Sequence, residues 1–268
     1  MSVRWDPGQY QRFGDERGRP FVELLLRVDA ARAPDAGDPS YVVDLGCGPG
    51  PLTRLLADRW PTAMVRGVDS SPDMVASAQE QAIEGRLTFA VGDIATWQSD
   101  RPVDVLLANA ALHWVPGHVD LFRRFTEMLT PNGVFAFQVP DNFTEPSHTL
   151  LRDLRLSPRW RDRLGEGADR GVGVERPERY LQALVAAGLD ADVWQTSYLH
   201  VLGGDDAVLE WVKGTALRPV LSVLDDADRE EFLKEYGAAL RAAYPPEPHG
   251  TVFPFRRTFA VARHSWRT

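Results

Sequence analysis

Between Tyr41 and Pro140, short apolar runs rich in β-branched and aromatic residues alternate with stretches whose apolar residues recur at helical spacing. This alternation predicts a parallel sheet with crossover helices, and so an α/β fold. The predicted strands cover Tyr41–Gly46, Met64–Ser70, Arg86–Ile94, Val103–Ala111 and Gly133–Pro140. The helices between them are marked by three apolar faces: Leu52, Leu55 and Leu56; Met74, Val75 and Ala78; and Leu121, Phe122, Phe125 and Leu129.

The pattern changes after Pro140. A compact helix is predicted over Pro177–Ala187, and two strands over Ala191–Leu202 and Thr251–His264 complete the far edge of the sheet as an antiparallel pair. The region between these strands, Asp205–Ala243, is helical in pattern and is interpreted as an insertion that caps the cleft. We therefore expect one domain over residues 1–268, with a mostly parallel seven-stranded sheet and helices on both faces. Its core sheet covers about 41–140, 176–202 and 251–264, and its cap elements cover about 144–175 and 203–250.

Composition narrows the class of protein. The 268 residues are 44% apolar and 25% charged, as in ordinary globular proteins, and the formal net charge of −8 argues against a general nucleic-acid surface. The arginines between Arg152 and Arg163 are interrupted by acids and are interpreted as a solvated helix face. The start of the chain lacks a signal-peptide core, and no apolar run approaches the ~20 residues of a membrane span. We expect a cytoplasmic protein with no membrane partner.

The glycine-rich stretch after the first predicted strand indicates a ligand. Gly46, Gly48 and Gly50 follow the spacing GxGxG, and Pro51 stands where the dinucleotide fingerprint GxGxxG requires its third glycine. Proline suits the first turn of a helix, so this loop opens the helix that carries Leu52. The spacing disfavours a nicotinamide or flavin dinucleotide, although a dinucleotide oxidoreductase stays an alternative.

Acids at the ends of three successive predicted strands suggest which ligand the loop holds. Asp44 repels a pyrophosphate but attracts an ammonium group. Asp69 can accept hydrogen bonds from both hydroxyls of a ribose, and Asp93 can accept from an adenine amino group beside the apolar Ile94. An ammonium, a ribose and an adenine on one ligand point to S-adenosylmethionine.

With these acids, the stretch DLGCGPG at Asp44–Gly50 resembles the first motif of the class I, Rossmann-like methyltransferases. The resemblance implies that Asp44 and the loop with Cys47 hold the methionine portion of the donor, and that Asp69 holds the ribose, with Ser70 in the same set. It further implies that Met74 packs beside the adenine, that Asp93 and Ile94 contact the adenine, and that Asn109 and Ala110 lie beneath the donor.

The flanking segments resemble a narrower family, the trans-aconitate 2-methyltransferases. The segments are WDPGQYQRFGDERGRP, ALHWVPGH, VPDNFTEPSH, DVWQTSYLH and FPFRRTFAVA. This resemblance implies a monomethyl ester formed on a small tricarboxylic acid. A methyltransferase for another small carboxylate or hydroxylated metabolite, and a non-catalytic sensor of an adenosyl ligand, stay open as alternatives.

A carboxylate acceptor has a pKa near ~4 and is already an anionic nucleophile at neutral pH, so the enzyme has mainly to position it. Its other carboxylates need cationic partners, preferably arginine. The candidates are Arg257 and Arg17, with Tyr10, Trp114, Tyr198 and His200 as walls. His113 would orient a carboxylate, or act as a base for a hydroxyl or amine. The scattered histidines and the single cysteine predict no metal site.

Overall fold

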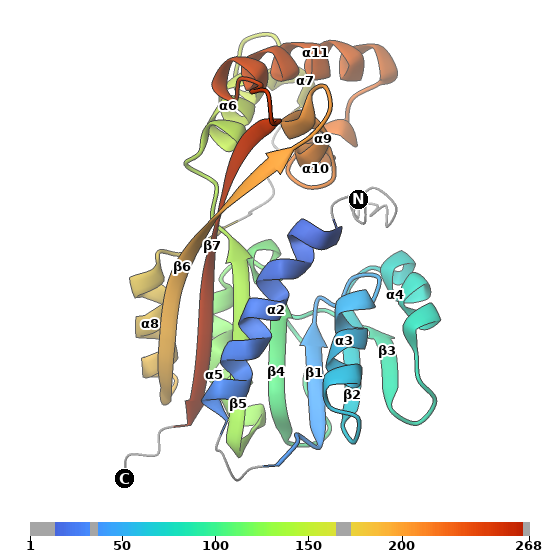
Figure 1. The fold of residues 1–268 in the computed structure, drawn as a ribbon, viewed down its shortest axis with the longest axis vertical. Coiled ribbons are helices and arrows are strands. Elements are labelled where there is room, and N and C mark those ends of the chain that lie inside the picture. The colour runs from blue at the N-terminus through green and yellow to red at the C-terminus, as the bar shows by residue number, and fades with distance from the viewer. Residues whose placement is uncertain (1–13, 33–36, 165–172, 265–268) are drawn as a thin grey trace. The chain divides into compact units, whose positions relative to one another are not determined.

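The computed structural model describes residues 14–32, 37–164 and 173–264, and these contain one seven-stranded sheet in the order β3-β2-β1-β4-β5-β7-β6 (Figure 1). β1 to β5 are parallel, and β7 runs antiparallel to β5 and β6. The strands are β1 Tyr41–Leu45, β2 Met64–Asp69, β3 Leu87–Val91, β4 Val103–Asn109, β5 Leu129–Pro140, β6 Leu189–Leu202 and β7 Thr251–His264. The predicted fold class is confirmed, including the antiparallel far edge.

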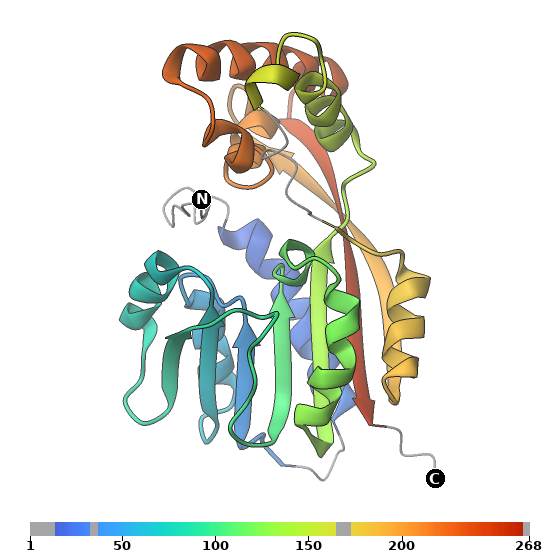
Figure 2. The same ribbon diagram turned by 180° about the vertical axis from the view of Figure 1, so that it is seen from behind.

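Helices cover both faces of the parallel part of the sheet. α2 (Gly14–Ala31) and α3 (Pro51–Arg59) lie on one face, and α5 (Phe122–Met128) lies on the other together with α8 (Pro177–Ala186) (Figures 1 and 2). α4 (Pro72–Ala78) contacts β2 and β3. Because the strands are parallel, the carboxyl ends of β1 to β4 meet at one edge, which is where ligands bind in such sheets.

The end of β3 and the start of β5 differ from the sequence-based expectation. β3 stops at Val91 because Asp93 begins a tight turn, in which the Trp97 N–H donates to the Asp93 carbonyl at 2.7 Å. β5 starts earlier than expected because Leu129 pairs with Val103, with a register shift before the regular pairing with β4 resumes. α2 was not expected, although its buried Phe21, Leu24 and Val28 have helical spacing.

The described chain divides into two compact units. The larger contains residues 15–32, 37–140, 173–196 and 258–264, and the smaller contains 141–164 and 197–257. The core of the larger unit includes a cluster of aromatic side chains from α5, β5 and α8: Phe122, Phe125, Phe135, Phe137 and Tyr180. The organisation as one domain with a cap over a cleft stays a prediction.

The smaller unit is built from helices packed on the ends of β6 and β7. Its core includes buried side chains from five helices: Leu151, Leu164, Trp211, Val220 and Phe232 are examples, one from each. The helices are α6 Pro146–Arg155, α7 Arg161–Leu164, α9 Ala207–Lys213, α10 Arg218–Leu221 and α11 Asp226–Ala243. Of the helices that the structure describes, none combines the length and the apolar character needed to cross a membrane.

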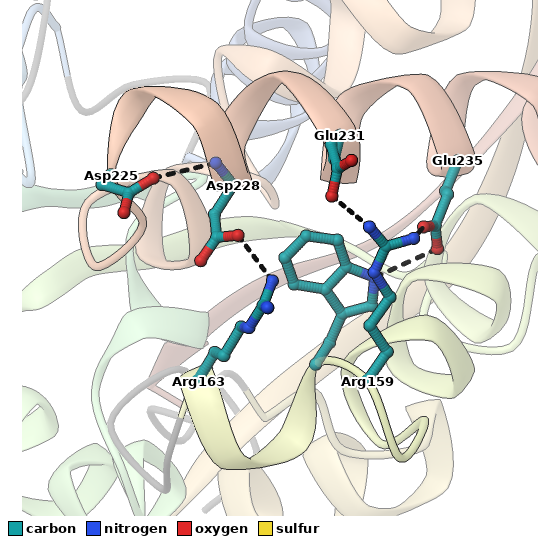
Figure 3. A network of polar contacts seen from close by, with 7 residues as sticks. Arg159, Arg163, Asp225, Asp228, Glu231 and Glu235 are labelled. Carbon is teal, nitrogen blue, oxygen red and sulfur yellow. Dashed lines mark hydrogen bonds and ion pairs between the residues drawn. The ribbon is translucent and has the colours of Figure 1, made fainter.

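Arg159 and Arg163 are exposed, as expected of a solvated arginine face, but they also make ion pairs that the sequence did not predict. Figure 3 shows Arg159 and Arg163 pointing at carboxylates of α11, where Arg159 pairs with Glu231 and Glu235 and Arg163 pairs with Asp228 at 2.5 Å. Both guanidinium groups lie over the ring of Trp160, which is fully buried. The partners are about seventy residues away in the chain, so local charge spacing could not reveal them.

Candidate functional site

The loop between β1 and α3 has the left-handed backbone that its glycines permit. The φ angles of Gly46, Gly48 and Gly50 are +78°, +55° and +91°, a region that L side chains rarely adopt. The Gly46 N–H and the Cys47 N–H both donate to the Val68 carbonyl, at 2.7 and 3.1 Å, which fixes the loop to the end of β2. This loop and the adjoining ends of β2, β3 and β4 are called the donor cradle below.

The three glycines differ in what a Cβ atom would meet. At Gly46 it would lie 2.3 Å from the Cβ of Ala111, and at Gly50 it would lie 3.0 Å from the ring of Phe89, so both glycines allow close packing within the protein. At Gly48 nothing lies within 4 Å. The backbone at Gly48 therefore borders open space, as a surface that a ligand approaches closely would.

Asp44, at the end of β1, is a buried carboxylate beside this loop. The Thr53 hydroxyl donates to its Oδ2 at 2.6 Å, whereas Oδ1 is buried with no hydrogen-bond partner among the residues that the structure describes. The pKa of Asp44 is raised to about 6, chiefly by burial and to a smaller extent by the nearby charge of Asp69, while the hydrogen bond from Thr53 lowers it. A buried anion with an unused acceptor favours a cationic ligand nearby.

Asp69 ends β2 and ties the loop to the next helix. Its Oδ2 accepts from the Gly48 N–H and its Oδ1 accepts from the Ser71 N–H, both at 2.9 Å. Burial raises the pKa of this half-buried carboxyl, and the two backbone hydrogen bonds lower it. Since an ionised carboxylate has about four acceptor positions, each oxygen still has room for a ribose hydroxyl.

Ser70 and Met74 were expected to belong to the same site. The side chain of Ser70 is exposed, and it is Ser71 that caps α4, accepting from the Met74 N–H at 3.3 Å with Pro72 at the first helical position. Met74 is buried on α4. Sequence reasoning missed Ser71, which a search for a serine before a helix-starting proline would have found.

Asp93 and Ile94 lie in the turn after β3. The Asp93 side chain is exposed and accepts from the Ala95 N–H at 2.8 Å through Oδ1. Ile94 is buried, and its Cδ1 lies 3.6 Å from the position that a Cβ on Gly46 would take. The structure thus places Ile94, which was predicted to contact the adenine, against the glycine loop.

Asn109 and Ala110 end β4 at the same edge of the sheet. Gln138 of β5 donates from Nε2 to Asn109 Oδ1 at 2.7 Å, and its carbonyl accepts from the Ala110 N–H at 2.9 Å. Ala110 has a φ of +51°, a strained conformation for a residue other than glycine. Sequence reasoning missed the orienting role of Gln138, although a glutamine within the apolar run GVFAFQVP was a visible signal.

Cys47 belongs to the cradle through its backbone. Burial raises the pKa of its thiol strongly, and the charges of Asp44 and Asp69 raise it further, so the sulfur stays protonated. A protonated thiol is a poor nucleophile. The raised pKa therefore disfavours Cys47 as a nucleophile.

His113 and Trp114 lie in a short 3₁₀ turn after β4, with ring centroids 4.8 Å apart. His113 is buried, and its carbonyl accepts from the Gly173 N–H at 3.1 Å. Five residues further on, His118 binds the Val115 carbonyl through Nδ1 and the Tyr180 hydroxyl through Nε2. Burial lowers the pKa of His118, which favours the neutral ring.

Three of the residues predicted for the acceptor meet in the smaller unit. Tyr198 and His200 of β6 have stacked rings 6.1 Å apart, and the ring of His200 lies 6.1 Å from that of Phe255 on β7. The Arg257 guanidinium, 5% exposed, lies 4.8 Å over the Phe255 ring. The ring of Trp211 of α9 lies 4.8 Å from that of His200. We call this set the aromatic-arginine face; it consists of Tyr198, His200, Trp211, Phe255 and Arg257.

Two further candidates were Tyr10 and Arg17. Tyr10 lies outside the described residues, as does the side chain of Arg17, so both stay predictions. Phe255 and Trp211 were missed, because aromatic residues on strands and helices are common in cores and carry no specific signal.

The donor cradle fits S-adenosylmethionine by its chemistry. The open space at Gly48 admits a ligand to the backbone, the unused oxygen of Asp44 favours its ammonium, and Asp69 offers acceptors for hydroxyl groups. The individual residue roles stay predictions.

Comparisons with known proteins agree with this chemistry. A family model described as a methyltransferase domain matches residues 42–133. Three similar proteins are each named trans-aconitate 2-methyltransferase. That of Streptomyces avermitilis is 53% identical over 96% of this chain and 96% of its own length. That of Streptomyces coelicolor is 54% identical over 97% and 86%, and that of Mycobacterium tuberculosis is 44% identical over 96% and 96%.

Solved structures resemble the chain in fold. The YcgJ protein of Bacillus subtilis has a TM-score of 0.57 at 18% identity, covering 91% of this chain and 99% of that protein. A Haemonchus contortus phosphoethanolamine N-methyltransferase 2, solved with S-adenosylmethionine, has a TM-score of 0.56 at 16% identity, covering 92% and 53%. At these identities the likeness establishes the architecture alone.

Proposed function

Because the chain belongs to the trans-aconitate 2-methyltransferase family, we propose that it transfers a methyl group to one carboxylate of trans-aconitate and releases the monomethyl ester. It is a methyltransferase that uses S-adenosylmethionine and acts on a small molecule. The single observation that carries the acceptor assignment is the match, over 96% of this chain, to a relative named trans-aconitate 2-methyltransferase. Among the described lysines and arginines, Arg257 alone lies in the buried class, and its guanidinium lies over the ring of Phe255.

The donor cradle is proposed to bind each part of the donor with different residues. The negative charge of Asp44 favours the donor ammonium, and the Gly46–Gly50 backbone admits the methionine portion. Asp69 accepts from the ribose hydroxyls. Asp93 accepts from the adenine amino group, with Ile94 and Met74 against the ring and Asn109 and Ala110 beneath the donor. The geometry described above supports each of these roles without testing it.

The aromatic-arginine face is proposed to bind the acceptor. The planar fork of Arg257 suits a carboxylate because it donates two parallel hydrogen bonds. Tyr198 and His200 then act as walls beside the bound anion, while His113 and Trp114 are proposed to orient the acceptor. A trianionic substrate has carboxylates to spare for such a cation while another carboxylate receives the methyl group.

The reaction needs no general base. The acceptor carboxylate is already ionised at neutral pH, so His113 has no proton to remove. S-adenosylmethionine, when bound, supplies an electrophilic methyl group on a sulfonium. The residues contribute by orientation and by excluding water, and well-oriented intramolecular reactions gain on the order of 7–11 kcal/mol from such positioning.

The test of this function combines binding and turnover in one preparation. Calorimetric titration with S-adenosylhomocysteine measures donor-site binding, and mass spectrometry of trans-aconitate incubated with enzyme and S-adenosylmethionine measures the product. Binding with a mass gain of one methyl group supports the proposal. Binding without that product would show that trans-aconitate is not the acceptor. Other small carboxylates and hydroxylated metabolites would then be screened.

Asp69→Ala is expected to weaken the binding of S-adenosylhomocysteine by about 1–3 kcal/mol, because charged hydrogen bonds to the ribose are lost. Calorimetry measures this directly. Asp73→Ala is the matched control, since it removes an exposed acid from the first turn of α4. Unchanged binding by the Asp69 variant would contradict the ribose role.

Donor binding is expected to weaken as the pH falls below about 6. The folded pKa of Asp44 is raised from 3.8 to about 6, so the native protein holds this proton more tightly than the unfolded chain does. For folding, the free energy that this proton contributes to the native state is therefore fully present below about pH 4 and is lost as the pH rises through about 6. A donor ammonium favours the ionised form, so the apparent Kd rises by up to about tenfold per pH unit below that pKa.

Calorimetry with S-adenosylhomocysteine between pH 5 and 8 checks this dependence. Asp44→Asn is the control, because it keeps the shape and cannot ionise. It is expected to bind more weakly at pH 8 and to lose most of the pH dependence. The same slope in wild type and variant would contradict the role of Asp44.

A further inference from the structure

Arg124 of α5 makes two contacts that the function described above does not use. Its Nη1 donates to the Ala95 carbonyl at 2.7 Å and its Nη2 donates to the Ile94 carbonyl at 2.8 Å. One guanidinium fork thus holds two successive carbonyls in the connection that follows β3. The side chain is half-buried, and its Nε is buried with no hydrogen-bond partner in the described part of the chain.

These carbonyls belong to a single helical turn. The N–H groups of Thr96 and Trp97 donate to the Asp93 carbonyl at 3.0 and 2.7 Å, and the Ala95 N–H donates to the Asp93 side chain. One turn with no continuing helix leaves its last carbonyls without intrahelical partners. Arg124 satisfies two of them, so the turn is capped by Asp93 at its start and by Arg124 at its end.

This turn presents the residues proposed to recognise the adenine. Asp93 is its first residue, and Ile94 reaches from it to the glycine loop at Gly46. A change in the turn would therefore move the carboxylate and the apolar side chain together. The carboxylate is the more sensitive of the two, because a hydrogen bond to a ligand depends on direction as well as distance.

We propose that Arg124 is a positioning residue that holds the Asp93–Trp97 turn and thereby sets the selectivity of the donor site for adenine. The inference rests on the proposed role of Asp93. An adenine presents an amino group to the Asp93 carboxylate, whereas hypoxanthine presents a carbonyl oxygen, which the carboxylate repels. Arg124 is not a catalytic residue, since it acts through the backbone of Ile94 and Ala95.

Arginine is required here for its shape. Its planar fork spans two carbonyls at once, whereas the ammonium of lysine is a point charge on a flexible stem. The preceding residue provides a matched control. Arg123 is in the same helix, its side chain is 84% exposed, and it pairs with Glu127 one turn later. Arg123→Lys therefore makes the same substitution away from the turn.

The test measures the Kd of S-adenosylhomocysteine and of S-inosylhomocysteine for wild type, Arg124→Lys and Arg123→Lys. Wild type and Arg123→Lys are expected to prefer the adenosyl ligand to the same degree. In Arg124→Lys this preference is expected to fall by roughly five- to tenfold, because the hydrogen bond from adenine to the Asp93 carboxylate is misaligned and weakened but not abolished. A general loss of stability would weaken both ligands equally and leave their ratio unchanged.

A double-substitution cycle tests whether Arg124 acts through Asp93. In an Asp93→Ala background, Arg124→Lys is expected to have no further effect on the ratio, because Arg124 acts through Asp93. A ratio within twofold of wild type in Arg124→Lys overturns the proposal, as does an effect that persists without Asp93. Arg124→Gln, which can donate to one carbonyl, is the second variant if the lysine protein does not fold.

The readout needs no acceptor. Failure to methylate trans-aconitate would overturn the proposed substrate and leave the ligand ratio intact. Failure of wild type to bind S-adenosylhomocysteine would instead overturn the donor site itself.

Discussion

Arg257→Ala is expected to raise the KM for trans-aconitate by roughly 100-fold while the Kd of S-adenosylhomocysteine stays within twofold of wild type. The guanidinium is the buried cation of the aromatic-arginine face, stacked on Phe255. Removing it leaves an acceptor carboxylate desolvated without a partner, which costs more than the loss of an exposed ion pair. Steady-state kinetics with varied acceptor at saturating donor measure the effect.

Two further variants define what Arg257 contributes. Arg257→Lys keeps the charge but loses the fork and is expected to lie between wild type and the alanine variant. Lys234→Ala removes an exposed cation from α11 of the same unit and is expected to leave acceptor kinetics unchanged. An unchanged acceptor KM in Arg257→Ala would place the carboxylate elsewhere, whereas equal losses of donor and acceptor binding would indicate misfolding.

Trp160→Ala is expected to lower the free energy of unfolding by about 3–5 kcal/mol, the usual cost of removing a large buried aromatic side chain. The indole is fully buried, packs edge-on against Phe232 at 5.1 Å and donates from Nε1 to Glu235 at 3.0 Å. Its loss removes the main contact between the segment around α7 and the α11 helix. Urea denaturation followed by far-ultraviolet circular dichroism measures the loss.

The ion pairs over Trp160 are expected to contribute much less to stability than the buried indole does. Glu231→Gln breaks the pair with Arg159, whose side chains are about half exposed, and such pairs contribute roughly 0–1 kcal/mol. We therefore expect the Glu231 variant to stay within about 1 kcal/mol of wild type. A loss as large as that of Trp160→Ala would mean that the charge network dominates the packing at this position.

The fold was largely predictable because its signals are local. The apolar runs with β-branched residues predicted the ends of β1, β2 and β4 to within two residues, because the pattern of apolar positions directly reflects burial. The ends of β3 and β5 were less predictable. They depend on a turn closed by Asp93 and on an irregular pairing between Val103 and Leu129, which arise from contacts with other parts of the chain.

The positions of the acids around the glycine loop were predictable for the same reason. Parallel strands bring their carboxyl ends to one edge, so Asp44, Asp69 and Asp93 could be placed together from their positions at strand ends. The hydrogen bonds that hold these strand ends and turns were not predictable. Thr53, Gln138 and Arg124 are ordinary residue types, and what they orient depends on which atoms the fold brings within hydrogen-bond distance.

The sequence by itself determined the α/β sheet, the glycine loop and the acids around it, because each follows from local periodicity or from strand order. Only the tertiary structure decided that Asp44 is buried with an unused oxygen, that Arg257 lies over Phe255, and that Arg159 and Arg163 bind α11. The physical reason is that burial and long-range pairing depend on contacts between residues distant in the chain, and a spacing pattern contains no information about distance in space.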